Sequence, residues 1–211
     1  MSEKKRIKVV LLGESGVGKT NLIRVAVGEP FQKESDSTLS SSYYESEIII
    51  KNKQYIYALW DTAGQEQYRA LNKMFLKGAK IVIIVFSIDN VQSFEQVDFW
   101  VDHTKEALGE GKYLIALVAN KNDLVDQQVV QDDDIAKKAK ELNVKFKLTS
   151  AAEDAVGFRQ FLEVLLKDFA NKSGFEEEGE KTFELKDEEK EEENVDDKDN
   201  KTKKKKKKKC C

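Results

Sequence analysis

A glycine-rich segment that follows a short apolar run restricts the fold of this sequence more than any other feature. Residues 7–12 are apolar except for Lys8, and Gly13-Glu14-Ser15-Gly16-Val17-Gly18-Lys19-Thr20 comes directly after them. The run is too short for a helix and ends at glycine, which is typical of a strand buried in a parallel sheet. Glycines let the backbone turn sharply and direct several N–H groups at one point, where the dipole of a following helix adds positive charge. The pattern predicts an anion-binding turn between a strand and a helix.

The last two residues of this segment indicate which anion binds. Lys19 provides a cation that can reach the outer phosphates of a nucleotide, and the Thr20 hydroxyl is a suitable ligand for a phosphate-bound Mg²⁺. An ordinary glycine-rich turn between a strand and a helix is the alternative. The fixed spacing of four residue types argues against it, and we predict a nucleoside polyphosphate site.

Composition limits the remaining possibilities. The 211 residues leave room for one α/β domain and a tail. The two cysteines, Cys210 and Cys211, are the last residues, which excludes a disulfide framework and a CxxC metal site. The single histidine, His103, lies in a polar stretch and is expected at the surface. Catalysis by a Ser-His or Cys-His pair is therefore disfavoured, because no other histidine is available. Without an apolar run of transmembrane length or a signal peptide, the chain is expected in the cytoplasm.

Strand-like and helix-like segments alternate along the first 170 residues. Strands are expected at residues 7–12, 43–50, 55–60, 81–86, 114–119 and 145–148. Helices are expected at residues 21–27, 67–76, 91–108, 132–142 and 155–169. The second and third strands form an antiparallel hairpin, while the other connections favour parallel neighbours. We predict an α/β fold of three layers: a six-stranded, mostly parallel sheet with helices on both faces. Its ligands bind at the carboxyl ends of the strands.

Two further motifs follow predicted strands. In Asp61-Thr62-Ala63-Gly64-Gln65-Glu66, Asp61 can hold Mg²⁺ through a water and Gly64 offers an unhindered N–H to a terminal phosphate. On its own this motif could also be a common turn. In Asn120-Lys121-Asn122-Asp123, the Asp123 carboxylate can accept two N–H bonds from the edge of guanine, and adenine cannot offer that pattern. Together the motifs predict a guanine nucleotide.

Over roughly residues 6–170 the chain resembles Ras-superfamily small GTPases, most closely the Rab subfamily. The matching segments stand in family order: Gly13–Thr20, Thr38, Trp60–Glu66, Asn120–Asp123 and Thr149–Ala151. The resemblance implies a P-loop NTPase domain of the Ras-like type at residues 1–170. It also implies a switch that binds GTP or GDP with Mg²⁺ and slowly hydrolyses GTP to GDP and phosphate. An activating protein is expected to supply an arginine for hydrolysis.

The resemblance also assigns roles to individual residues. The residues implied in nucleotide binding are Glu14, Ser15, Gly16, Val17, Gly18, Lys19, Thr20, Phe31, Thr38, Gly64, Asn120, Lys121, Asp123, Ser150 and Ala151. Thr20, Thr38 and Asp61 would organise Mg²⁺, and Asp61 would act through a water. Lys19 and Gly64 would act on the γ-phosphate, and Gln65 would orient the attacking water.

Two departures from the Rab pattern fall near these residues. Rab proteins usually follow the switch threonine with Ile-Gly-Val-Asp-Phe, whereas this chain has Leu39-Ser40-Ser41-Ser42-Tyr43 in the segment that effectors would contact. The usual lysine after Ser-Ala is Ala152, which removes one side chain over the guanine. A nucleotide-binding scaffold with little useful hydrolysis therefore stays open as an alternative. An ATP-dependent P-loop kinase is disfavoured by residues 120–123.

Residues 171–211 are expected to form a disordered tail. An acidic block at residues 184–199 precedes seven lysines, Lys203–Lys209, and then Cys210-Cys211. This ending resembles the double cysteine that Rab proteins have geranylgeranylated, and two lipid chains give stable anchoring. The lysines would add attraction to anionic lipid, although a nuclear-localisation or nucleic-acid role is their alternative.

The tail and the domain together imply a membrane-anchored switch in vesicle trafficking, on the cytosolic face of an intracellular membrane. The partners implied are an exchange factor, a GTPase-activating protein, a prenyl-chaperone protein of the GDI type and effectors. No nucleic acid partner is expected.

Overall fold

The computed structural model describes residues 5–33, 43–62 and 74–172. The chain divides into two compact units, Met1–Glu178 and Gly179–Cys211, and all the described residues belong to the first. Several predictions fall outside the described residues: those for Thr38, Gly64, Gln65, Cys210 and Cys211, most of the helix at 67–76, and nearly all of the tail. In the described part of the chain, no helix combines the length and the apolar character needed to cross a membrane.

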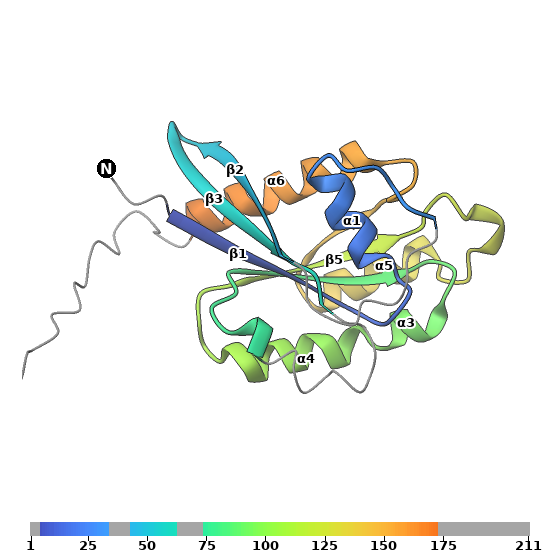
Figure 1. Ribbon diagram of the computed structural model, residues 1–211. Helices are drawn as coiled ribbons and strands as arrows, with labels where there is room; N and C mark the ends of the chain where they lie inside the picture. Colours follow the sequence, from blue (N-terminus) through green and yellow to red (C-terminus); the bar gives the residue numbers. More distant parts are fainter. Residues whose placement is uncertain (1–4, 34–42, 63–73, 173–211) are drawn as a thin grey trace, which may run out of the picture. The chain divides into compact units, whose positions relative to one another are not determined.

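Six strands form one sheet in the order β2-β3-β1-β4-β5-β6 (Figure 1). Their bounds are β1 (Lys5–Leu12), β2 (Tyr43–Ile50), β3 (Lys53–Trp60), β4 (Ile81–Ser87), β5 (Leu114–Asn120) and β6 (Lys145–Leu148). Only β2 and β3 pair antiparallel, and the four other pairs of neighbours are parallel. The predicted fold class is confirmed, including the single antiparallel hairpin.

Helices cover both faces of the sheet (Figure 1). Their bounds are α1 (Lys19–Ala26), α3 (Val91–Glu95), α4 (Val97–Leu108), the 3₁₀ helix η2 (Val125–Gln127), α5 (Asp132–Glu141) and α6 (Ala155–Lys172). One core cluster joins α1 and α6 to one face, and a second joins α4 and α5 to the other. Successive side chains of a strand point to opposite faces. Within β1, Val9 and Leu11 accordingly lie in the first cluster, and Val10 and Leu12 lie in the second.

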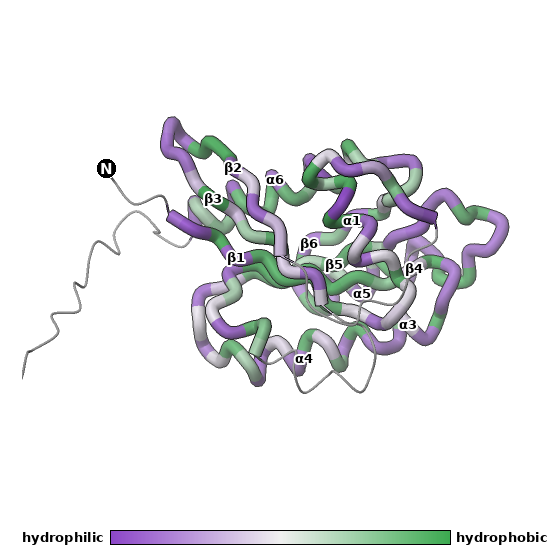
Figure 2. Tube along the Cα trace, viewed as in Figure 1, coloured by the Kyte–Doolittle hydropathy of each residue, from purple (hydrophilic) through white to green (hydrophobic). Residues whose placement is uncertain are grey.

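This double covering explains why the central strands β4 and β5 are almost continuously apolar. Every residue of β4 is buried, and the central strands are mainly hydrophobic, whereas hydrophobic and hydrophilic residues alternate along the surrounding helices (Figure 2). A parallel sheet with both faces covered has no face left for polar side chains. Polar residues are therefore concentrated beyond the strand ends, where the candidate site lies.

The prediction for residues 91–108 was wrong in one respect, because the structure divides this segment into two helices. Gln96 ends α3 and begins α4, and its ψ of −2° departs from the helical value near −42°. The apolar spacing continues on both sides of Gln96, so the hydrophobic pattern gave no indication of the break.

His103 was expected at the surface, and the structure corrects this prediction. The residue is only 8% exposed. Its ring stacks on Phe99 with centroids 5.7 Å apart and meets Trp100 edge-on at 6.0 Å. His103 follows these residues by four and three positions, which places all three on neighbouring parts of one helix surface. Its polar sequence neighbours concealed this aromatic contact.

Gly13, in the turn after β1, has no room for a side chain. A Cβ at Gly13 would lie 2.0 Å from the backbone oxygen of Val85, and its φ is 142°. Gly78 also has a positive φ, 76°, but a Cβ there would meet nothing within 4 Å. Gly78→Ala should lower the free energy of unfolding by about 1 kcal/mol through backbone strain alone. Gly13→Ala should cost about 2 kcal/mol more because of the added collision. Urea unfolding followed by circular dichroism measures both, and equal losses would contradict this account.

Candidate functional site

The candidate site lies where the parallel strands end. The phosphate cradle, residues 13–20, follows β1, Asp61 follows β3, and residues 120–123 begin at the end of β5. Residues 149–151 come directly after β6. Because these strands are parallel, their carboxyl ends lie at one edge of the sheet. The fold thus gathers motifs that are widely separated in the sequence.

The cradle has the geometry of an anion site. Gly18 is the N-cap of α1 with a φ of 94°, and no side chain of the described residues caps the helix. The first N–H groups of a helix have no partner within the helix and carry partial positive charge. The cradle therefore presents backbone donors and the positive end of a helix dipole at the same place, as the sequence predicts.

Lys19 adds a charge that is almost completely buried. The side chain is 6% exposed, and Nζ donates hydrogen bonds of 2.9 Å to the backbone oxygens of Gly13 and Glu14. Desolvation lowers the pKa of Lys19 to about 8, although the charges of Asp61 and Glu14 partly oppose this shift. An anion placed beside Nζ would stabilise its protonated form and raise the pKa again. The cradle is therefore suited to a phosphate group.

Thr20 and Asp61 form a pair that suits Mg²⁺. Thr20 Oγ1 donates a hydrogen bond of 2.7 Å to Asp61 Oδ2, and Asp61 is fully buried. Hydroxyl and carboxylate oxygens are the ligands that Mg²⁺ prefers, and the ion usually combines one or two protein ligands with phosphate oxygens and waters. The donor set thus fits a magnesium ion shared with a nucleotide. The described residues contain no group of three or more His, Cys, Asp or Glu side chains that could hold a metal.

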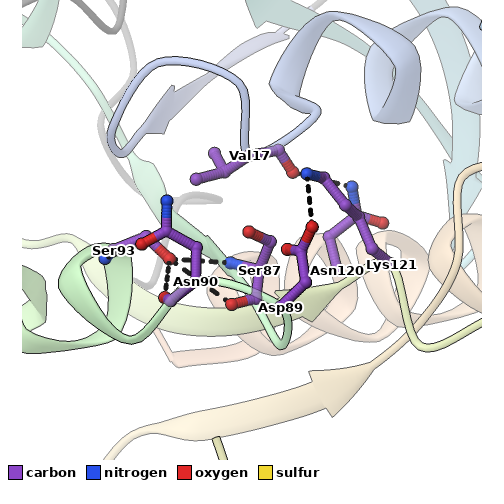
Figure 3. A network of polar contacts seen from close by, with 7 residues as sticks. All are labelled: Val17, Ser87, Asp89, Asn90, Ser93, Asn120 and Lys121. Carbon is purple, nitrogen blue, oxygen red and sulfur yellow. Dashed lines mark hydrogen bonds and ion pairs between the residues drawn. The ribbon is translucent and has the colours of Figure 1, made fainter. Parts of the chain in front are cut away.

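Asn120 connects the cradle to the loop after β6. Its Nδ2 donates to Val17 O at 2.8 Å (Figure 3), and its Oδ1 accepts from Ala151 N at 3.1 Å. The contact is so close that a Cβ on Gly18 would lie 2.3 Å from Nδ2. Both ends of the Asn120 amide thus bond to the protein. The geometry assigns this residue to fixing the distance between two loops.

Asp123 is oriented by Ser150. Ser150 Oγ donates to Asp123 Oδ1, and it accepts from the N–H groups of Ala152 and Glu153 at 3.1 and 3.0 Å. Asp123 is half-buried. The sequence predicts Ser150 only as a nucleotide-binding residue, whereas the structure shows it bonding to the carboxylate expected to contact the base. Ala152 is exposed and carries no long side chain toward this region.

Three positioning residues were missed by sequence reasoning. Asn21 bonds in both directions with the backbone of Gln32, at 2.9 and 3.0 Å, and thereby fixes the segment next to Phe31. Thr62 Oγ1 donates to Leu11 O at 2.6 Å and holds the end of β3 against β1. Asp89, after β4, lies 3.1 Å from Lys121 Nζ. Their only indication in the sequence was a place next to a motif or a strand end.

The motifs predicted to bind a nucleotide, as far as the structure describes them, thus lie beyond the carboxyl ends of the parallel strands, at one edge of the sheet. Phe31 precedes Gln32, whose backbone bonds to Asn21 of α1, and it is 40% exposed, so its ring has surface available for a base. The predictions for Thr38, Gly64 and Gln65 fall on residues that the structure does not describe.

Comparison with known proteins agrees with this geometry. The sequence model of the Ras family matches residues 8–171. The chain is also similar to the Ras-related protein RABF2b of Arabidopsis thaliana, with 36% identity over 144 residues. That alignment covers 68% of this chain and 72% of the relative. The chain therefore belongs to the Ras family and is a Rab-like small GTPase of the Ras superfamily.

Proposed function

We propose that this protein is a guanine-nucleotide switch that binds GTP and GDP with Mg²⁺, slowly hydrolyses GTP, and acts on intracellular membranes. One observation carries the proposal: the Asn120 amide joins the phosphate cradle at Val17 to the base-contacting loop at Ala151. A single side chain thereby sets the separation of two half-sites that one nucleotide would occupy. Membership of the Ras family supports the same conclusion.

In the proposed complex each half-site recognises a different part of the nucleotide. The backbone of residues 14–19 and the Lys19 ammonium hold the phosphates. Asp123 accepts two N–H bonds from guanine and the Lys121 stem lies along the base. The N–H of Ala151, which bonds to Asn120 Oδ1 at 3.1 Å, would be shared with the base oxygen. Adenine is rejected because the Asp123 carboxylate would face an acceptor.

The metal site would consist of Thr20, Thr38 and Asp61, the last through a water. Ras-family GTPases generally use Mg²⁺ with GTP or GDP, and the ion neutralises charge that develops on the phosphates. Gln65 then orients a water for in-line attack on the γ-phosphate, and the Gly64 N–H contacts the same group. The bond from the γ-phosphorus to the β–γ bridging oxygen breaks, and the products are GDP and phosphate.

Hydrolysis on this chain would be slow without a partner. Among the described residues no arginine has a contact with the cradle, and a GTPase-activating protein would supply one. The product of the cycle is a change of shape: the γ-phosphate holds Thr38 and Gly64, and its loss releases both. Effectors and an exchange factor would distinguish the two states.

The end of the chain supports a membrane location. Two prenylated cysteines, Cys210 and Cys211, would anchor the switch stably, and Lys203–Lys209 would add attraction to anionic lipid of about 1 kcal/mol per residue. A prenyl-chaperone protein of the GDI type would extract the lipidated chain. We infer a role in vesicle trafficking on the cytosolic face of an intracellular membrane.

A scaffold that binds nucleotide with little useful hydrolysis is the second candidate. It is favoured by residues 39–43, which depart from the Rab pattern in the segment that effectors would contact. It shares the whole binding site with the first candidate, so binding measurements cannot separate the two.

Nucleotide competition tests the binding site. Unlabelled GDP should displace a fluorescent GDP from the full chain, whereas ADP at the same concentration should not. Asp123→Ala should weaken GDP binding about a hundredfold or more, because the guanine N–H groups lose a charged acceptor. Asp126→Ala changes an exposed carboxylate of the neighbouring η2 and should leave the affinity unchanged. Equal displacement by GDP and ADP would refute the assignment of the base.

Single-turnover hydrolysis separates the switch from the scaffold. The GTP-loaded chain should release phosphate slowly, and Gln65→Leu should reduce that rate by about tenfold or more because water loses its orienting group. GDP affinity, measured in parallel, should not change. If both chains convert GTP at the same negligible rate, with and without activating proteins from a cell extract, the scaffold is correct.

The tail proposal is tested by membrane location. A tagged full chain should decorate an intracellular membrane, and Cys210→Ser with Cys211→Ser should make it diffuse because no lipid can be attached. Replacing Lys203–Lys209 by glutamines should weaken the membrane signal without abolishing it. A cysteine-free chain that stays on the membrane would contradict the anchor, and one that concentrates in the nucleus would favour the alternative role of the lysines.

A further inference from the structure

Lys121 has an unusual backbone conformation at the site. It directly follows β5 and has a φ of 64°, in the left-handed region that residues other than glycine rarely occupy. Such a conformation persists where the surroundings hold the residue in place. Lys121 Nζ lies 3.1 Å from Asp89 Oδ2, on the loop after the neighbouring strand β4 (Figure 3). The structure thus provides an anionic partner for this lysine.

The loop that carries Asp89 is fixed by its own hydrogen bonds. Ser93 Oγ donates to Asn90 O at 2.7 Å and accepts from Ser87 N at 3.1 Å (Figure 3). Asn90 Oδ1 in turn accepts from Ser93 N at 3.0 Å and caps α3. Asp89 lies inside this closed turn. Its carboxylate is therefore placed by the fold and does not depend on a ligand.

The same loop is bonded to the end of β5. The N–H of Ile88 donates to Asn120 O at 3.1 Å, and the N–H groups of residues 129–130 donate to Ile88 O at 2.9 and 3.1 Å. Asn120 and Lys121, two consecutive residues of the predicted guanine motif, are thus each held by a different loop. The cradle holds the Asn120 side chain, and the loop after β4 holds the Lys121 side chain.

The ion pair is partly shielded from water. The side chains of Lys121 and Asp89 are 30% and 19% exposed. Desolvation tends to raise the pKa of Asp89, but the nearby Ser87 hydroxyl, the hydrogen bond from Lys121 and the charge of Lys121 bring it below its ordinary value. Asp89 is consequently ionised at neutral pH. Salt screens a part-buried pair less than one at the open surface.

We propose that Asp89 is a positioning residue for nucleotide retention, which holds the Lys121 side chain along the guanine and slows nucleotide release. This inference rests on the proposed guanine-nucleotide site. Ala152 makes the contribution of Asp89 larger in this chain, because it offers no second stem to cover the base. Asp89 acts through Lys121 and does not itself touch the nucleotide.

Nucleotide release provides the test. The full chain is loaded with fluorescent GDP and Mg²⁺, an excess of unlabelled GDP is added, and the dissociation rate is measured. Asp89→Asn keeps the shape and removes the charge, and it should speed release roughly fivefold, the effect of one part-buried ion pair. The matched control is Asp98→Asn, which removes the carboxylate of a 2.7 Å pair between Asp98 in α4 and Lys138 in α5. Its release rate should equal that of the wild type.

Two further variants separate positioning from general structure. In a Lys121→Ala background, which itself releases GDP faster, Asp89→Asn should have no additional effect because its partner is gone. Asp89→Glu keeps the charge and should restore slow release. Wild-type rates for Asp89→Asn, or an undiminished effect in the Lys121→Ala background, would overturn the inference. If the wild type itself fails to retain GDP, the proposed function fails instead.

Discussion

The site depends on one buried charge. The Lys19 ammonium is 6% exposed and bonds to two backbone oxygens of its own cradle. Removing a cation from water is costly, as the lowered pKa of Lys19 reflects, and the free protein bears that cost as a loss of stability. A bound phosphate would relieve it, so ligand binding and stability are coupled at this residue. The helix dipole and the turn after β1 would stabilise the same anion.

A parallel sheet turns distant segments into one site. Val17 and Asn120 are 103 positions apart in the sequence, yet the Asn120 amide bonds to the cradle because β1, β4 and β5 end at the same edge. The loop after β4 adds Asp89 to the same edge. The two core clusters pack against opposite faces of the sheet and hold the strands in place. The loops at the strand ends are therefore attached to a rigid, close-packed core.

Sequence reasoning succeeded for features that depend on residues close together in the chain. Apolar, β-branched and aromatic runs identified all six strands. Spacing within short motifs indicated Lys19, Thr20 and Asp61 as candidates for the site, and the fold brings Thr20 and Asp61 into contact. It failed where a property depends on neighbours in space. The burial of His103 arises from its helix face, the break at Gln96 is a local change in backbone angle, and Asp89 matters because β4 lies beside β5. None of these three features corresponds to a recognisable pattern in the sequence.

The sequence by itself determined the fold class, the phosphate cradle and the residue types available for a metal and a guanine, because backbone conformation and chemistry follow from residues close together in the chain. The tertiary structure alone decided how far the phosphate cradle lies from the loops at residues 120–123 and 149–151. It also decided which side chains bond to the residues expected to contact a nucleotide. Asn120, Ser150 and Asp89 acquire these tasks only when strand order makes their loops neighbours. Hydrogen bonds and ion pairs act over a few ångströms, so their partners are set by the packing of strands.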